Sequence, residues 1–309
     1  MFTEYFFSVC NCVYFLLLRP IYKWTLHQLT GQCELLRLTA GPSANRQRGV
    51  TTKNIEKSLK LSKQLKSSWR LIQNAEDANV DDISSEIATI KNIKPQLYPR
   101  FESTMKVFLN QLCGYRLLMA DVEKMRKIIY TDENQNHEAS LMKLWANLMP
   151  NTPLESRITK QWTDIGFQGD DPKTDFRGMG LLGLNNLVHF STNYKDQARQ
   201  LLSHSNHPQT GYSFAIVGIN ITSLTYDLLM KGHLKTHLYN VIQGAPDINH
   251  FHYVYCYLFT EFDQFWIDAK PENIMQFNEV REKFESKMIE LLEDNSTCFK
   301  LNFQTSSDC

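Results

Sequence analysis

Apolar residues return at helical spacing along almost the whole chain, and this spacing constrains the fold more than any other feature. In the stretch that begins at Pro95, they recur every three or four positions, which is the spacing of a buried helical face. These residues are Phe101, Met105, Phe108, Leu109 and Leu112. Alternating β-branched runs bounded by turns, which are typical of strands, are almost absent. The sequence therefore predicts an all-α fold.

Turn-forming residues divide this helical pattern into segments. We expect helices over residues 81–91, 95–113, 115–130, 141–148, 196–202, 212–230, 233–242 and 251–267, and a last helix that starts at Pro271. Gly114 is expected to separate two of them. In the segment 115–130 the inward-facing residues are predicted to be Leu118, Val122, Met125 and Ile129.

The stretch from residue 162 to residue 190 holds five of the chain's 13 glycines. Such a density indicates a backbone that turns tightly or is closely approached by another group. Asp171-Pro172 disfavours helix at its own position, and apolar residues return at helical spacing after Gly180. We expect a helix, then a polar loop with Arg177 at its exit, and then a buried helix.

Two interpretations of Arg177 are open from the residues alone. In the first, it pairs with a carboxylate of its own loop, which is Asp170, Asp171 or Asp175, and ties the loop shut. In the second, Gly178 lets the backbone approach a partner while the guanidinium group reaches out, since its planar fork suits phosphate oxygens. An extendable arginine in a chain without a nucleotide-binding loop fits an arginine finger supplied in trans.

Other catalytic and metal-binding patterns find little support. His233 and His237 stand four residues apart, but no acidic residue completes a metal site, so a surface or capping role is favoured. His250, His252 and Cys256 lie among aromatic residues and are expected in the core or at its rim. No Gly-x-Ser-x-Gly elbow and no phosphate-binding loop occur. Lys and Arg balance Asp and Glu at 33 each, so we expect no nucleic-acid partner. Because the metal and nucleotide patterns are missing, we expect no metal and no cofactor of the chain's own.

Residues 2–18 form the only long apolar run, which Glu4 interrupts. About 17 residues is the lower limit for a helix that spans a bilayer. Arg19 and Lys23 follow in place of a cleavage site, so we expect an uncleaved membrane-seeking segment with the rest of the chain on the cytosolic side. A helix that lies in the interface or packs on the body is the alternative.

Residues between this run and the helical body are basic and rich in turn formers. Gly41-Pro42-Ser43 and residues 46–52 are expected to form a flexible link. The basic residues between Glu34 and Arg70 could meet anionic headgroups, but a solvated helix face is the favoured interpretation.

Spaced residues around Arg177 carry a resemblance to a known family. They are Trp162, Gly166, Phe167, Gln168, Gly169, Asp171, Pro172, Thr174, Asp175, Phe176, Arg177, Gly178 and Gly180. Together with residues 141–145, 205–208, 215–220 and 259–263, they resemble the signature of the ELMO domain. The resemblance covers about residues 133–297, and the N-terminal run with residues 31–35 extends it to the short ELMO domain-containing proteins.

This resemblance implies a domain layout and an activity. The layout is an N-terminal apolar segment (1–30), a basic linker and helical extension (31–132), a single multi-helix ELMO domain (133–297) and a C-terminal tail (298–309). The implied activity is GTPase activation toward Arf-family and Arf-like small GTPases, with Arg177 as the catalytic arginine finger and the other twelve residues as its supporting loop. GTP and Mg²⁺ would be bound by the partner. The expected location is the cytosol and the cytoplasmic face of intracellular membranes such as the endoplasmic reticulum.

The resemblance also leaves a rival function open, which is a non-catalytic helical scaffold that docks small GTPases or exchange factors at membranes. Exposure of the Arg177 side chain would separate the two. Within the loop, we expect the aspartates to hold the backbone, with Trp162 and Phe176 packed beneath it. Asp175 would then position Arg177, although it could instead cap the helix that follows.

Overall fold

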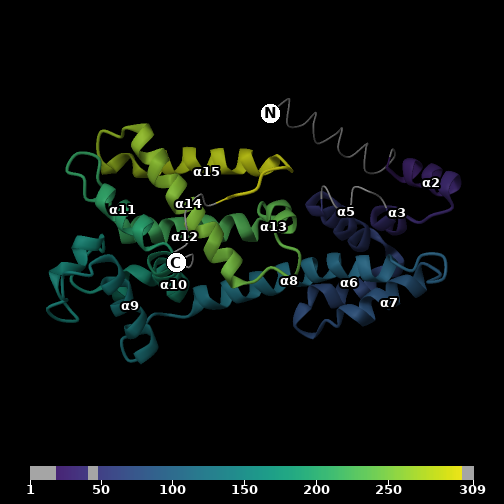
Figure 1. The fold of residues 1–309 in the computed structure, drawn as a ribbon, viewed down its shortest axis with the longest axis horizontal. Coiled ribbons are helices and arrows are strands. Elements are labelled where there is room, and N and C mark those ends of the chain that lie inside the picture. The colour runs from purple at the N-terminus through teal and green to yellow at the C-terminus, as the bar shows by residue number, and fades with distance from the viewer. Residues whose placement is uncertain (1–18, 41–47, 301–309) are drawn as a thin grey trace. The chain divides into compact units, whose positions relative to one another are not determined.

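The computed structural model describes residues 19–40 and 48–300, and within these ranges it contains helices and no strand (Figure 1). The prediction of an all-α fold is confirmed. The apolar run at residues 2–18 lies outside the described residues, as do residues 41–47 and 301–309. Among the described helices, none combines the length and the apolar character that crossing a membrane requires.

The chain divides into two compact units, residues 1–113 and residues 114–309, and the division falls within the long helix α8 (Phe101–Lys127). Besides the first half of α8, the described part of the first unit contains α2 (Arg19–Thr30), α3 (Glu34–Ala40), α5 (Arg48–Leu61), α6 (Lys66–Gln73) and α7 (Val80–Ile90). Short 3₁₀ turns, η2 (Lys63–Leu65) and η3 (Ala75–Asp77), join α5 to α6 and α6 to α7.

The expected flexible link does not extend to residue 52, because α5 begins at Arg48. The side chain of Thr52 is buried, and its hydroxyl group donates a hydrogen bond to Oε1 of Gln111 in α8, at 2.7 Å. Further along, Lys53, Lys60 and Lys66 are exposed, as a solvated helix face requires. The opposite face of α5 and α6 supplies buried apolar residues, which include Ile55, Leu59 and Ile72.

The second unit is organised around α10 (Gly180–Asn193). Helix α10 contacts α9 (Gln135–Leu148), α11 (Lys195–Ser205), α12 (Phe214–Met230) and α14 (Ile248–Ala269) (Figure 1). Its residues Leu182, Leu184 and Phe190 are fully buried. Two more helices, α13 (Lys235–Val241) and α15 (Phe277–Glu293), complete the described part of this unit.

Several of the expected helix boundaries are wrong: the helix expected to open at Pro95 begins at Phe101, and the one expected to reach residue 130 ends at Lys127. The last helix begins at Phe277 instead of Pro271, because Asn273 caps a separate 3₁₀ turn, η6 (Ile274–Gln276), by accepting the N–H of Met275. Helix α8 runs through Gly114 without a break. A Cβ atom at Gly114 would lie only 2.6 Å from Cβ of Ala245, so this glycine permits a close approach and does not end the helix.

The expected surface role for His237 is also wrong. Helix α13 begins at Lys235, so His233 is not on the same helix. His237 is buried, its Nδ1 accepts the N–H of Phe299 at 3.2 Å, and burial lowers its pKa to about 4. His252 and Cys256 are buried as expected, and within the described ranges no three His, Cys, Asp or Glu side chains gather as metal ligands would.

The close approach at Gly114 gives a first prediction. In an ordinary helix, Gly→Ala stabilises by up to about 1 kcal/mol. We expect Gly114→Ala to lower the free energy of unfolding by about 1–3 kcal/mol, because the added methyl group overlaps Ala245 and Pro246. Chemical denaturation measures the change. Gly169→Ala is the control, since no atom lies within 4 Å of the added methyl group; a stabilised Gly114→Ala protein would contradict the prediction.

Candidate functional site

The residues around Arg177 form two short 3₁₀ helices, η4 (Lys160–Ile165), where a helix was expected to lead into the loop, and η5 (Pro172–Arg177), within the expected polar loop. We call residues 159–180 the Arg177 loop. Asp171 begins η5 as its N-cap, since its Oδ1 accepts the N–H of Lys173 at 3.0 Å, and Pro172 occupies the first position. The N–H of Thr159 donates to the carbonyl oxygen of Asp170 at 3.0 Å. The loop therefore has defined secondary structure.

Two glycines of the loop are required by its own folding. Gly166 has a φ of +85°, and a Cβ atom there would lie 2.2 Å from the backbone nitrogen of Phe214, at the start of α12. Gly180 has a φ of +53°, and a Cβ atom would lie 2.2 Å from the carbonyl oxygen of Arg126, at the end of α8. Each combines a left-handed backbone with a close approach that only glycine permits. These close approaches fix the backbone of the Arg177 loop at two points, one before the polar segment and one at the loop's C-terminal end.

A row of aromatic rings packs beneath the loop. Trp162 lies with its ring centroid 5.4 Å from Trp145 of α9 and 5.8 Å from Phe167. Phe176 continues the row at 5.6 Å from Phe167 and 5.3 Å from Tyr130. All five rings are buried, which confirms the prediction that Trp162 and Phe176 support the loop.

Arg157 ties the loop to α9, a role that no local pattern in the sequence indicated. Its Nε donates to Glu138 at 2.6 Å, and its Nη1 donates to Oδ1 of Asp171 at 3.0 Å. The phenol of Tyr130 donates to the other oxygen of Glu138 and accepts from Nη2 of Arg157 at 3.4 Å. The backbone carbonyl of Arg157 also accepts Nε1–H of Trp162, at 2.9 Å. The N-cap of η5 is therefore fixed by a half-buried guanidinium group.

Asp175 holds the loop and does not cap the next helix. Its Oδ2 accepts the backbone N–H of the exposed Gln168 at 2.9 Å, whereas the N-cap of α10 is Met179. Burial raises the pKa of Asp175, while the Gln168 hydrogen bond and the charge of Arg177 oppose this shift. The expectation that Asp171 and Asp175 organise the loop agrees with these contacts.

Arg177 is exposed at the last position of η5, and its Nε donates to the carbonyl oxygen of Thr174 at 2.8 Å. Within residues 19–40 and 48–300, no carboxylate lies at salt-bridge distance from it. The interpretation in which Arg177 ties the loop shut is therefore wrong. A Cβ atom on Gly178 or Gly169 would meet no atom within 4 Å, so the fold of this chain does not require glycine at either position.

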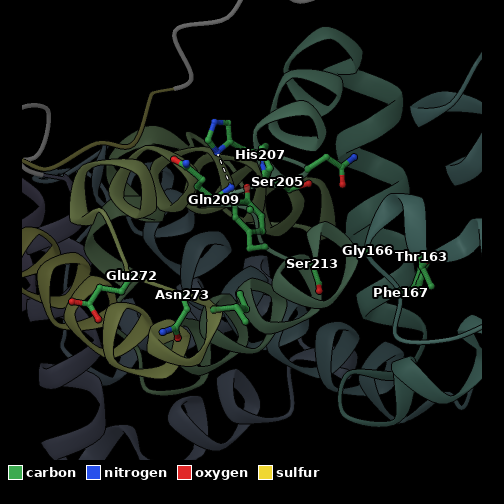
Figure 2. A pocket seen from close by; sticks show the side chains of 14 residues that line it. Thr163, Gly166, Phe167, Ser205, His207, Gln209, Ser213, Glu272 and Asn273 are labelled. Carbon is green, nitrogen blue, oxygen red and sulfur yellow. Dashed lines mark hydrogen bonds between the residues drawn. The ribbon is translucent and has the colours of Figure 1, made fainter.

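A cleft of about 540 Å³ borders the loop (Figure 2). Gly166 and Phe167 line it, together with residues 205–213 and 272–274. In the segment 205–213, the N–H of Gln209 donates to Nδ1 of His207 at 3.3 Å (Figure 2). The cleft lies beside the predicted site, but Arg177 does not line it.

A buried carboxylate holds one wall of this cleft. The hydroxyl group of Tyr212 donates to Oδ1 of Asp263 at 2.6 Å, and Nδ1 of His204 lies 2.8 Å from its Oδ2. Burial raises the pKa of Asp263, although both hydrogen bonds oppose the shift. Asp263, in one motif that carries the resemblance (259–263), is thereby joined to residues on both sides of another (205–208).

Comparison with known proteins gives the same family for most of the chain. The family model of the ELMO/CED-12 family matches residues 120–281. The chain is 51% identical to ELMO domain-containing protein 2 of Homo sapiens over 281 residues, which cover 90% of this chain and 93% of that protein. It is 44% identical to ELMO domain-containing protein 1 of Mus musculus, over 99% and 97% of the two chains. ELMO domain-containing protein B of Dictyostelium discoideum is 36% identical, over 90% and 95%. No solved structure matches the chain.

The raised pKa of Asp175 gives a second prediction. A carboxyl group with a raised pKa contributes most stability below its unfolded pKa of about 3.9, and this contribution is lost as the pH rises through the folded-state pKa. Asp175→Asn keeps an oxygen acceptor for the Gln168 N–H but removes the buried charge. We therefore expect the variant to melt at a higher temperature than the parent at pH 7, with the difference vanishing below about pH 3.5.

Thermal unfolding monitored by circular dichroism across this pH range measures the effect. The control is Asp170→Asn, which changes an exposed carboxylate of the same loop and should leave the melting temperature unchanged. If Asp175→Asn melts below the parent at pH 7, the ionised carboxylate stabilises the loop and the expected sign is wrong.

Proposed function

This chain belongs to the ELMO/CED-12 family, and from that premise we propose that it is a GTPase-activating protein for Arf-family and Arf-like small GTPases. In this proposal the chain supplies Arg177 in trans as an arginine finger. GTP and Mg²⁺ belong to the partner, and this chain contributes no cofactor. The exposure of Arg177 at the end of a well-anchored 3₁₀ helix is the observation that supports the proposal most directly.

The mechanism follows from where charge develops during phosphoryl transfer. The guanidinium group of Arg177 would enter the partner's nucleotide site and neutralise charge on the oxygens between the β- and γ-phosphates. Fingers of this kind accelerate hydrolysis roughly 10³–10⁵-fold, or by about 4–7 kcal/mol. The backbone of the loop is held by Asp171, Asp175 and the aromatic row, so the partner would meet a finger whose base is already placed.

A non-catalytic scaffold that docks GTPases or exchange factors at membranes remains the rival proposal. In a scaffold, Arg177 would serve the fold or binding alone. Two observations favour the finger: Arg177 has no carboxylate partner among the described residues, and Gly178 has open space around it where a partner's backbone could approach.

Arg177→Lys separates the two proposals. Lysine keeps the charge but loses the fork that bridges two phosphate oxygens. We expect the variant to lose most of its GTPase activation while it keeps its fold and much of its partner binding, because the interaction is made mainly in the transition state. The measurement is single-turnover hydrolysis by GTP-loaded Arf-like proteins at saturating variant, beside thermal unfolding.

Arg199→Lys is the matched control. Its Nε donates to the carbonyl oxygen of Asn147 at 2.8 Å, the same kind of bond that Arg177 makes, but it lies on α11. A folded Arg177→Lys protein that accelerates hydrolysis within about threefold of the parent, a difference of ~0.7 kcal/mol, would exclude the finger.

We also propose that residues 2–18 hold the chain at the cytoplasmic face of intracellular membranes, such as the endoplasmic reticulum, in exchange with the cytosol. The apolar run followed by Arg19 and Lys23 supports this. Deletion of residues 2–18 should move the protein from the membrane fraction to the soluble fraction of cells. Deletion of residues 301–309 is the control. An unchanged distribution after the N-terminal deletion would refute membrane attachment through this segment.

A further inference from the structure

Ile129 occupies a position that helical periodicity does not explain. The spacing of Leu118, Val122 and Ile129 predicts that all three face inward. Leu118 and Val122 are fully buried, but α8 ends at Lys127 and Ile129 is 82% exposed. A single exposed apolar residue is common on protein surfaces and by itself indicates nothing. What distinguishes Ile129 is the backbone that carries it.

Residues 128–130 are attached to the end of the Arg177 loop at two points. The carbonyl oxygen of Ile128 accepts the N–H of Leu181 at 2.9 Å. Two residues later, the ring of Tyr130 packs against Phe176 at 5.3 Å. Ile129 lies between these two attachments on one segment of the backbone, and residues 177–180 lie between them on the other. Residues 128–130 and residues 176–181 therefore run alongside each other, which places Ile129 beside the short segment that begins with Arg177.

We propose that Ile129 is an apolar anchor by which the partner GTPase docks beside Arg177. This inference rests on the proposed function, and the occupant of the surface is the GTPase that receives the finger. A finger can enter a nucleotide site only if the partner's surface around that site covers the segments next to the finger. Specific interfaces bury about 800 Å² on each partner, far more than one arginine supplies, so neighbouring side chains must contribute.

The properties of Ile129 suit such a role. Its backbone is already fixed by the Ile128 hydrogen bond and the Tyr130 packing, so binding would order only one short side chain. Burial of an isoleucine side chain stabilises a complex in proportion to the apolar area removed from water. In the facing segment, Gly178 presents no side chain that would hold the partner away. The surface fits a GTPase with an apolar patch at the edge of its nucleotide site.

The anchor predicts a change in affinity without a change in the chemical step. We expect Ile129→Ser to weaken binding about tenfold, or ~1.4 kcal/mol. The probe is an Arf-like GTPase loaded with a non-hydrolysable GTP analogue, chosen from a panel as the one that the parent chain binds most tightly. Hydrolysis of GTP at saturating variant should stay within about twofold of the parent, because Arg177 is unchanged. Ile129→Leu keeps an apolar side chain at this position and should bind about as tightly as the parent.

Val241→Ser is the matched control, since Val241 is a β-branched residue that is 45% exposed at the end of α13. We expect its binding to equal that of the parent. The inference is overturned by any of three results. Ile129→Ser binds as tightly as the parent, Val241→Ser loses as much affinity as Ile129→Ser, or Ile129→Leu binds as weakly as Ile129→Ser. If Ile129→Ser also melts at a lower temperature, its folded fraction at the assay temperature is measured. The anchor is supported when the loss of affinity exceeds what the unfolded fraction explains, and it is overturned when the unfolded fraction explains the whole loss.

The same experiment separates this inference from the proposed function. If Ile129→Ser loses affinity while Arg177→Lys still accelerates hydrolysis, the docking surface stands and the finger is wrong. If Arg177→Lys abolishes acceleration while Ile129→Ser binds normally, the finger stands and the anchor is wrong. A parent chain that binds no GTPase of the panel overturns both.

Discussion

The guanidinium group of Arg157 joins segments that the chain order keeps apart, and the shape of the Arg177 loop depends on this connection. It hydrogen-bonds Glu138 on α9, the phenol of Tyr130 and the N-cap carboxylate of Asp171. A guanidinium group presents its donors in a fixed plane, so it sets the directions of its partners as well as their distances. Because Asp171 begins η5 and Arg177 ends it, the position of Arg177 follows from this network.

Polar ties and apolar packing hold the loop from different sides. Asp175 closes the loop through the backbone of Gln168, while Trp162, Phe167 and Phe176 exclude water beneath it. The exposed groups, Arg177 among them, therefore project from a backbone that folding has already ordered. A backbone that folding has already ordered loses little further conformational entropy on any binding event, and this is the physical basis of preorganisation.

The glycines of the loop divide into two groups once the neighbouring atoms are known. Gly166 and Gly180 are needed because α12 and the end of α8 approach their backbones closely. At Gly169 and Gly178 an added Cβ atom would meet no described atom within 4 Å, so packing does not require glycine there. A high local density of glycine indicated a special backbone, but it could not separate glycines that packing requires from those that it does not.

The sequence by itself determined the all-α class, the ELMO-type signature around Arg177 and the aromatic support of the loop, because helical spacing, Asp-Pro and glycine clusters are local signals. Only the tertiary structure decided that α8 continues through Gly114, that Ile129 is exposed and that Arg157 holds Asp171. Each of these depends on a group elsewhere in the chain: Ala245 against Gly114, Leu181 and Phe176 on the residues that flank Ile129, and Glu138 beside Arg157. Local propensity contains no information about which distant atoms arrive at a site, and packing among those atoms sets the outcome.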